Sequence, residues 1–233
     1  MSEHIGIVAC SAEGAALCYR TICREAPATM GRHAHPEISM HTPLLAAYMA
    51  CIERDDWSAV ADLMIASAQK LKACGADFLI CPDNTIHRAF EQAAARSLLP
   101  WLHIVEAVAD EAERRGFRRL GVLGTKYTMD GPVYSTILAR RSIEHRVPSP
   151  LDRIVVDRII FDELVNGIVR PESLAVFRAI IDHLKSDGCD AVVLGCTEIP
   201  LLVTPEHSPL PTLDSTSILA RAALHRATTS APR

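Results

Sequence analysis

One stretch of the sequence occurs twice in related form, and this internal repeat is the strongest constraint on the fold. Residues 71–85 read LKACGADFLICPDNT, and residues 184–198 read LKSDGCDAVVLGCTE. Aligned without a gap, the two segments share a Leu-Lys pair, a glycine and an aspartate, and Asp83 falls opposite Cys196. Each segment therefore reads as the end of a helix followed by a short buried strand.

A second pair of segments matches at almost the same distance along the chain. IGIVAC at 5–10 resembles LGVLGT at 120–125, with an offset of 115 residues against 113 for the first pair. Any two helix–strand units share composition, and that alternative explains a single short match. Two matches in the same order favour a duplicated half-domain.

Short aliphatic runs alternate with longer amphipathic ones, which predicts βα units around parallel sheets. The predicted strands are Ile5 to Cys10, Asp77 to Cys81, Trp101 to His103, Arg119 to Gly124 and Asp190 to Gly195. The predicted helices include Glu13 to Arg24, Trp57 to Ala73, Ile86 to Arg96, Val105 to Arg115, Pro171 to Ser186 and Ser217 to His225.

We therefore expect an α/β fold of two similar half-domains, each a short parallel β-sheet flanked by helices, related by pseudo-two-fold symmetry. The first half-domain is expected at residues 1–100 plus 212–233 and the second at residues 101–211. The C-terminal helix is amphipathic, so we expect it to bury its apolar stripe against the first half.

Composition narrows the class of partner. With 49% hydrophobic residues in 233, the chain can build a proper core, and a net charge of −4 gives no basic footprint for nucleic acid. The N-terminal Met-Ser-Glu-His lacks the features of a secretory signal, and no run approaches the roughly 18 apolar residues of a membrane span. These features predict a cytoplasmic protein with a small-molecule partner and no membrane partner.

The eight cysteines are predicted to be thiols, because a chain of this size does not need disulfides. No CxxC pair or Cys/His cluster has zinc-site spacing, so no metal is expected. Cys81 lies two residues before Asp83 and is interpreted as a buried small hydrophobe at a strand end.

Polar side chains follow both matched strands, at the edge where parallel α/β sheets bind ligands. Asp83 in PDNT and Cys196 in GCTE each place an acid–base group at a strand exit. Two alternatives stay open: Asp83 as a helix N-cap, and Cys196 as an inert core thiol. Glu198 either caps its helix or positions the thiol. Neutral hydrogen bonds to a substrate carboxylate are predicted from residues that would also suit turns, namely Ser11, Asn84, Thr85, Thr125 and Thr197.

Four motifs occur in order along the chain: PxNT at 82–85, GTKYTMDGPVY at 124–134, GCTEIPLL at 195–202 and PTLDST at 211–216. With them the chain resembles the aspartate/glutamate racemase superfamily. The resemblance implies two half-domains that each supply one catalytic residue, no cofactor such as pyridoxal phosphate, no metal, and a homodimer. It implies racemisation of acidic amino acids, with relatives that racemise hydantoins, isomerise maleate or decarboxylate malonate.

This chain departs from the family pattern at the first catalytic position, where the usual cysteine is replaced by Asp83. Arg170 resembles the position of a basic substrate-binding residue, although a solvated charge near a helix end would look the same. The second basic residue of acidic-substrate members has no match, because residues 41–43 read His-Thr-Pro. The expected partner is thus a small carboxylate or amino acid of unspecified side chain.

Three functions follow from these observations. The first is a cofactor-independent amino-acid racemase or epimerase in which Asp83 and Cys196 form an acid–base pair across the inter-domain cleft. The second is a one-thiol relative, a decarboxylase or cis–trans isomerase of a small carboxylic acid, in which Asp83 only orients substrate or water. The third is a non-catalytic protein that binds a small ligand.

Overall fold

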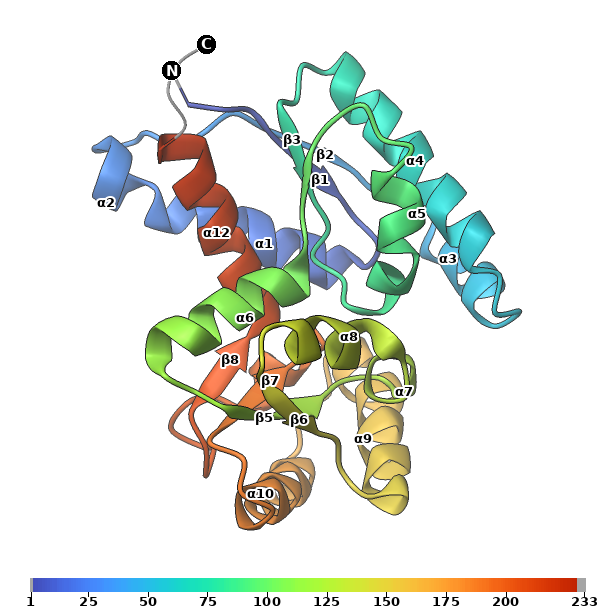
Figure 1. Cartoon of the computed structure of the whole chain (residues 1–233), viewed down its shortest axis with the longest axis vertical. Helices are drawn as coiled ribbons and strands as arrows, with labels where there is room; N and C mark the ends of the chain where they lie inside the picture. The colour runs from blue at the N-terminus through green and yellow to red at the C-terminus, as the bar shows by residue number, and fades with distance from the viewer. Residues whose placement is uncertain (1, 230–233) are drawn as a thin grey trace. The chain divides into compact units, whose positions relative to one another are not determined.

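The computed structural model describes residues 2–229, which form two compact units (Figure 1). Unit 1 contains residues 2–104 and 216–229, and unit 2 contains residues 105–215. Each unit is built on a four-stranded parallel sheet flanked by helices. The predicted α/β fold with a parallel sheet in each half is therefore confirmed.

The elements of unit 1 alternate between strands and helices. In chain order they are β1 Ile5–Val8, α1 Ala12–Glu25, α2 Pro27–Met30, β2 Ile38–His41, α3 Leu45–Ile52, α4 Trp57–Ala73, β3 Phe78–Ile80, the 3-10 helix η1 Thr85–Ala89, α5 Phe90–Ala94, β4 Trp101–Leu102 and, at the end of the chain, α12 Ser215–Thr229.

Unit 2 repeats this alternation. Its elements are α6 Ile104–Arg115, β5 Arg119–Leu123, α7 Lys126–Met129, α8 Pro132–Arg140, β6 Glu144–Arg146, α9 Pro150–Asp162, the 3-10 helix η2 Leu164–Asn166, α10 Pro171–Ser186, β7 Ala191–Leu194, α11 Ile199–Leu202 and β8 Thr212–Asp214. Within residues 2–229, no helix combines the length and apolar character that crossing a membrane requires.

The two sheets have the same topology. The strand orders are β2-β1-β3-β4 and β6-β5-β7-β8, and every pairing is parallel. The central strands β1, β3 and β7 are buried along their whole length, and β5 is buried after its first residue, as strands covered by helices on both faces must be. Their aliphatic residues therefore form the centre of each core.

The matched glycines of the repeat both sit at close contacts, Gly6 with strand β3 and Gly121 with helix α10. A Cβ atom on Gly6 would lie 2.6 Å from Leu79 Cδ2, and one on Gly121 would lie 2.8 Å from Leu184 Cδ1. Both glycines lie inside a central strand, where a side chain of the same unit packs over the backbone. Close packing therefore explains why both of these matched positions are glycine.

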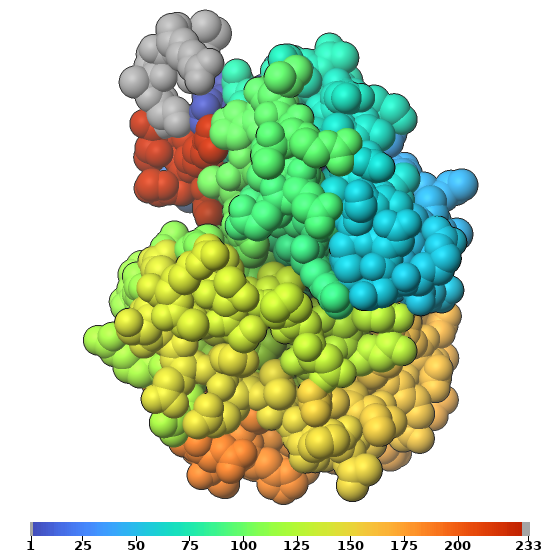
Figure 2. Space-filling view, turned by 45° about the vertical axis from the view of Figure 1, so that its right-hand side comes forward, coloured from blue at the N-terminus to red at the C-terminus, as the bar shows by residue number. Residues whose placement is uncertain are grey.

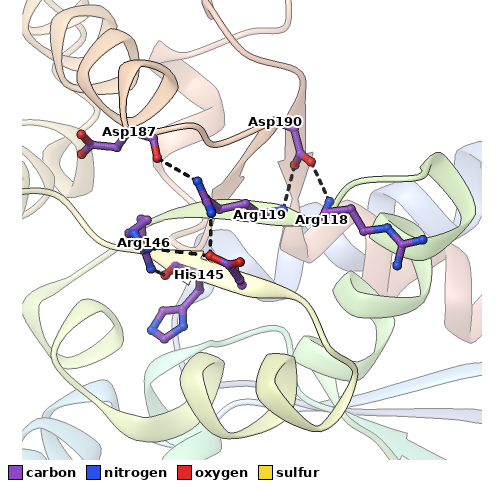
Figure 3. Close-up of polar contacts among 7 residues, drawn as sticks. Arg118, Arg119, His145, Arg146, Asp187 and Asp190 are labelled. Atoms are coloured by element: carbon purple, nitrogen blue, oxygen red, sulfur yellow. Dashed lines mark hydrogen bonds and ion pairs between the residues drawn. The ribbon is translucent and has the colours of Figure 1, made fainter.

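The matched aspartates also make matched contacts. Asp77 Oδ2 accepts a hydrogen bond from the His4 amide at 2.7 Å. In unit 2, Asp190 accepts from the amides of Arg118 and Arg119 at 2.7 and 3.2 Å (Figure 3). Each aspartate precedes one central strand and binds the backbone at the start of its neighbour, so it fixes the register of the pair.

The helix that follows the last strand of each unit belongs to the other unit. β4 pairs with β3 in unit 1, but the next helix, α6, belongs almost wholly to unit 2. Likewise β8 pairs with β7 in unit 2, and α12 belongs to unit 1 from Thr216 onwards. These pairings place the chain crossings at 104/105 and 215/216, whereas the sequence suggested 100/101 and 211/212.

Ionic and aromatic contacts hold α12 in unit 1. Arg221 Nη2 lies 2.8 Å from Glu25, and Arg226 Nε lies 3.1 Å from Glu3. The Arg226 guanidinium also stacks 4.2 Å above the Phe78 ring, at the edge of the core.

Candidate functional site

Asp83 and Cys196 occupy equivalent places in their own units. Asp83 is the third residue after β3 ends at Ile80, and Cys196 is the second residue after β7 ends at Leu194. β3 and β7 hold the same position in the two sheet orders. Each side chain is partly exposed, at the strand end where parallel sheets bind ligands.

Asp83 makes a capping contact in unit 1. Its Oδ1 atom accepts a hydrogen bond from the Ile86 amide at 3.1 Å, at the start of η1. The capping interpretation of this residue therefore has a structural basis. The next two residues, Asn84 and Thr85, are buried and half-buried at the same strand exit.

His87 supports the backbone of Asp83. Its Nδ1 lies 2.6 Å from the Asp83 carbonyl oxygen, and its Nε2 accepts from the Ile104 amide at 3.2 Å. The ring therefore carries its proton on Nδ1 and is neutral. Burial lowers the pKa of His87 to about 4, although the bond to the Asp83 carbonyl opposes this shift. His87 stacks on Phe90 with centroids 5.2 Å apart.

One thiol and one phenol, Cys81 and Tyr48, lie near Asp83. Cys81 is fully buried, as predicted, and burial raises its pKa well above the usual range. The hydroxyl of Tyr48 is also fully buried and makes no hydrogen bond of normal geometry. Burial raises the pKa of Tyr48, and nearby Cys81, Cys10 and Asp83 raise it further, while Ser67 lowers it. The raised pKa values keep Cys81 and Tyr48 protonated, so neither of them adds a charge near Asp83.

In unit 2, Glu198 forms a direct hydrogen bond with Cys196, the candidate catalytic residue. Its Oε2 atom accepts a hydrogen bond from Cys196 Sγ at 2.9 Å and another from Thr197 Oγ1 at 2.7 Å. Glu198 is only 6% exposed, so its carboxylate depends on these donors. Of the two roles left open by the sequence, the contacts favour thiol positioning.

Glycines bring the exits of β5 and β7 together. The Gly195 amide donates to the Leu123 carbonyl at 2.7 Å, and a Cβ atom on Gly195 would lie 2.7 Å from that oxygen. Thr125, buried beside this contact, has its Oγ1 3.4 Å from Thr128 Oγ1. Gly195 permits this close approach, and the next residue, Cys196, is partly exposed and packs against the core of unit 2.

The remaining predicted residues lie at helix starts. Ser11 is the N-cap of α1, where its Oγ accepts from the Gly14 amide at 3.2 Å. Arg170 precedes α10, has a side chain that is 57% exposed, and lies 3.9 Å from Glu163 Oε1. Both the turn interpretation of Ser11 and the solvated-charge interpretation of Arg170 therefore have support.

The predicted site residues thus fall into two groups, one at each sheet. Unit 1 holds Ser11, Asp83, Asn84 and Thr85; unit 2 holds Thr125, Arg170, Cys196, Thr197 and Glu198. Sequence reasoning missed Tyr48, because a tyrosine within a helical segment carries no motif. Among the described residues, no group of three His, Cys, Asp or Glu side chains is arranged to hold a metal ion.

Comparison with known proteins places this architecture in a class. A model of the Asp/Glu/Hydantoin racemase family matches residues 5–223. The chain therefore belongs to the Asp/Glu/hydantoin racemase family, and it is an isomerase of the Asp/Glu racemase type. Among curated proteins, the broad specificity amino-acid racemase RacX of Bacillus subtilis is 26% identical over 162 residues, which cover 68% of each chain.

Solved structures agree with this assignment over nearly the whole chain. A putative Asp/Glu racemase from Yersinia pestis is 32% identical with a TM-score of 0.90, covering 97% of this chain and 99% of its own. PH1733, an aspartate racemase homologue from Pyrococcus horikoshii, is 28% identical with a TM-score of 0.85, covering 98% and 100%.

Proposed function

We propose that the chain is an amino-acid racemase in which Asp83 and Cys196 act as the acid–base pair on one α-carbon. The observation that carries the proposal is their equivalence: both follow equivalent strands of two sheets with the same topology. A racemase needs one proton-transfer group for each face of the carbon, and a duplicated frame supplies two.

In one direction the Asp83 carboxylate removes the α-proton, and the Cys196 S–H gives its own proton to the opposite face. The electron pair of the broken C–H bond passes through the carbanion into the new C–H bond. Asp83 is then protonated and Cys196 is a thiolate, the state from which the other enantiomer reacts. Exchange with solvent restores the first state.

The proposed role of Glu198 is to orient the thiol. The bond from Cys196 Sγ to Glu198 Oε2, 2.9 Å long, directs the S–H and stabilises its protonated form. Glu198 touches the thiol and not the substrate in this scheme, so it is a positioning residue.

The proposed substrate is an amino acid held by its α-carboxylate. Asn84, Thr85 and Thr125 are the candidate neutral groups for this contact at the two strand ends, whereas the Thr197 hydroxyl donates its proton to Glu198. Arg170 is the candidate for a cationic contact, and it is more than half exposed. Because this candidate cation is exposed, these groups favour an amino acid whose side chain does not need two buried cations for binding.

A matched set of variants tests the pair. Asp83→Asn keeps an oxygen that accepts the Ile86 amide but cannot take a proton, and Cys196→Ser keeps a hydroxyl that is a far weaker acid. Each should lower racemase turnover at least about 100-fold, a typical contribution of one acid–base group. Cys81→Ser, two residues away from Asp83, should retain most activity. Full activity in Asp83→Asn would reduce Asp83 to a helix cap.

The capping contact favours one second candidate function. If Asp83 serves only η1, Cys196 would act alone as proton donor or nucleophile in decarboxylation or cis–trans isomerisation of a small carboxylic acid. In that case Asp83→Asn keeps activity while Cys196→Ser loses it, and the product is CO₂ or the isomeric alkene rather than an enantiomer.

A further inference from the structure

Three polar side chains of unit 1 form a continuous series of hydrogen bonds that the proposed reaction does not use. Lys70 Nζ lies 2.9 Å from His41 Nε2, and His41 Nδ1 lies 2.9 Å from Ser67 Oγ. Lys70 is exposed, His41 is half-buried and Ser67 is fully buried. We call these three residues the polar network, and it leads from solvent into the interior of the unit.

The elements that carry the polar network place it at the sheet edge near Asp83. His41 is the last residue of β2, and Ser67 and Lys70 lie about one turn apart on α4, which packs against β1 and β2. Strands β2 and β3 pair with β1 on its two sides and all three run parallel, so His41 lies at the same sheet edge as Asp83. Figure 2 shows that the segment containing α4, coloured light blue to cyan, faces solvent.

Tyr48 on α3 is the next polar group towards the interior. Its hydroxyl is fully buried and has no hydrogen-bond partner of normal geometry among the described residues. Burial raises the pKa of Tyr48, and the neighbouring Cys81 and Asp83 raise it further. Ser67 contacts the same hydroxyl and lowers its pKa. The Tyr48 hydroxyl therefore lies near both the inner end of the polar network and Asp83.

Lys70 fixes the direction of the donors in the polar network. An ammonium group can only donate, so His41 Nε2 accepts from Lys70 and His41 Nδ1 carries the ring proton. The Nδ1–H group donates to Ser67 Oγ, so the Ser67 O–H can point towards Tyr48. Burial lowers the pKa of His41, and the charge of Lys70 lowers it further, so the ring is neutral at neutral pH. All the donors thus point inward.

We propose that the polar network carries protons from solvent to Asp83 by way of the Tyr48 hydroxyl. This role rests on the proposed function, because an amino acid that reacts with protonated Asp83 leaves it ionised, and the proton must return before the next turnover. The Tyr48 O–H gives its proton to the carboxylate and takes one from Ser67. His41 gives its Nδ1 proton to Ser67 and takes one on Nε2 from Lys70, and water then reprotonates Lys70.

Exchange of the Tyr48 hydroxyl proton tests the path without any substrate. In equal parts of H₂O and D₂O, an isotopically labelled tyrosine Cζ gives separate signals for O–H and O–D when exchange is slow, and one averaged signal when it is fast. Tyr48 should give the averaged signal in wild type, although its hydroxyl is fully buried, and separate signals in Ser67→Ala. Tyr48→Phe identifies the signal, and Tyr134, buried in unit 2, should not respond to Ser67→Ala. Separate signals in wild type, or an averaged signal in Ser67→Ala, would overturn the path.

Turnover tests whether the path serves Asp83. Protonated Asp83 is the less stable state at neutral pH, so proton return should limit kcat for the enantiomer that needs this state, which is the one with the lower kcat. His41→Ala should lower that kcat at least about tenfold and KM in proportion, with kcat/KM unchanged, because the proton returns after product has left. Imidazole added to the solution should restore kcat. Lys72→Met, at an exposed lysine of the same helix, should keep the wild-type values.

The same assay separates this inference from the proposed function. A fall in kcat/KM, or a loss of kcat that imidazole does not restore, would make His41 a structural residue and overturn the path. If Asp83→Asn is inactive while His41→Ala turns over normally, the proposed function stands and the path to Asp83 is wrong. If Asp83→Asn is fully active, the proposed function fails, and with it the assignment of the path to Asp83.

Discussion

At the scale of single residues, Cys81 and Cys196 have opposite environments, although they lie only two positions apart when the two repeat segments are aligned. Cys81 is fully buried, with a pKa raised well above normal, whereas Cys196 is partly exposed and donates to Glu198. Thiol reactivity follows thiolate access, so Cys196 is the better candidate of the two for a reactive thiol.

Replacing Glu198 tests whether it controls the thiol. Glu198→Gln removes a negative charge next to Cys196 while keeping an oxygen acceptor, so the thiolate becomes easier to form. We expect alkylation by iodoacetamide at neutral pH to accelerate about tenfold, while racemase turnover falls. Glu206→Gln, at an exposed glutamate of the same unit, serves as control. An unchanged alkylation rate would mean that Glu198 only caps its helix.

The pKa of His87 predicts a pH-dependent stability. Its pKa is about 4 in the folded chain against about 6.5 when unfolded, so the unfolded state binds the proton first as pH falls. This stabilisation is complete above about pH 6.5 and is lost towards about pH 4, by an amount on the order of 3 kcal/mol. Urea unfolding between neutral pH and about pH 4 should show the loss in wild type.

His87→Gln should lack that part of the pH dependence, because glutamine does not titrate. His225→Gln, at an exposed histidine, should keep the wild-type slope. Equal slopes in wild type and His87→Gln would show that His87 is accessible to protons in the folded state.

At the scale of elements, Asp77 and Asp190 do the same work in the two sheets. Asp190 accepts two amide hydrogen bonds and Asp77 accepts one. We expect Asp77→Ala to lower the free energy of unfolding by about 1 kcal/mol and Asp190→Ala by about 2 kcal/mol. Asp187→Ala is the control, since its contact to Arg119 uses the backbone carbonyl (Figure 3). A cost at only one aspartate would contradict the shared role.

The central strands could be predicted from the sequence. Among the edge strands, only β4 could be predicted. β1, β3, β5 and β7 are buried aliphatic runs, which stand out in the sequence. β2, β6 and β8 read ISMH, EHR and TLD, and only one of their residues is fully buried. Edge strands need not be apolar on both faces, so composition does not reveal them.

Helix α9 escaped prediction for a different reason. Apolar residues on two of its faces hide the period of 3.6 residues that marks an amphipathic helix. The predicted helix from Ile86 to Arg96 is divided into η1 and α5, because Asp83 and His87 tie its first turn to the strand exit. The division into η1 and α5 lies where tertiary contacts override the local pattern.

At the scale of the whole molecule, duplication explains the common frame but not the different chemistry at its two strand exits. Asp83 in unit 1 and Cys196 in unit 2 could be located from the repeat, since the alignment places them opposite each other. Their partners could not, because the contact of His87 with Ile104 depends on chain segments that the repeat does not include. In the proposed function, each unit therefore supplies one proton-transfer group.

The most direct test of this account is solvent deuterium uptake during turnover of a pure amino-acid enantiomer in D₂O. With one group on each face of the α-carbon, the product enantiomer gains a deuteron at Cα, while unreacted substrate keeps its proton at early times. Proton NMR with chiral separation measures both. The account predicts this pattern from either enantiomer, abolished by Asp83→Asn and by Cys196→Ser. Deuterium entering substrate and product equally would contradict it, because a single group would then serve both faces.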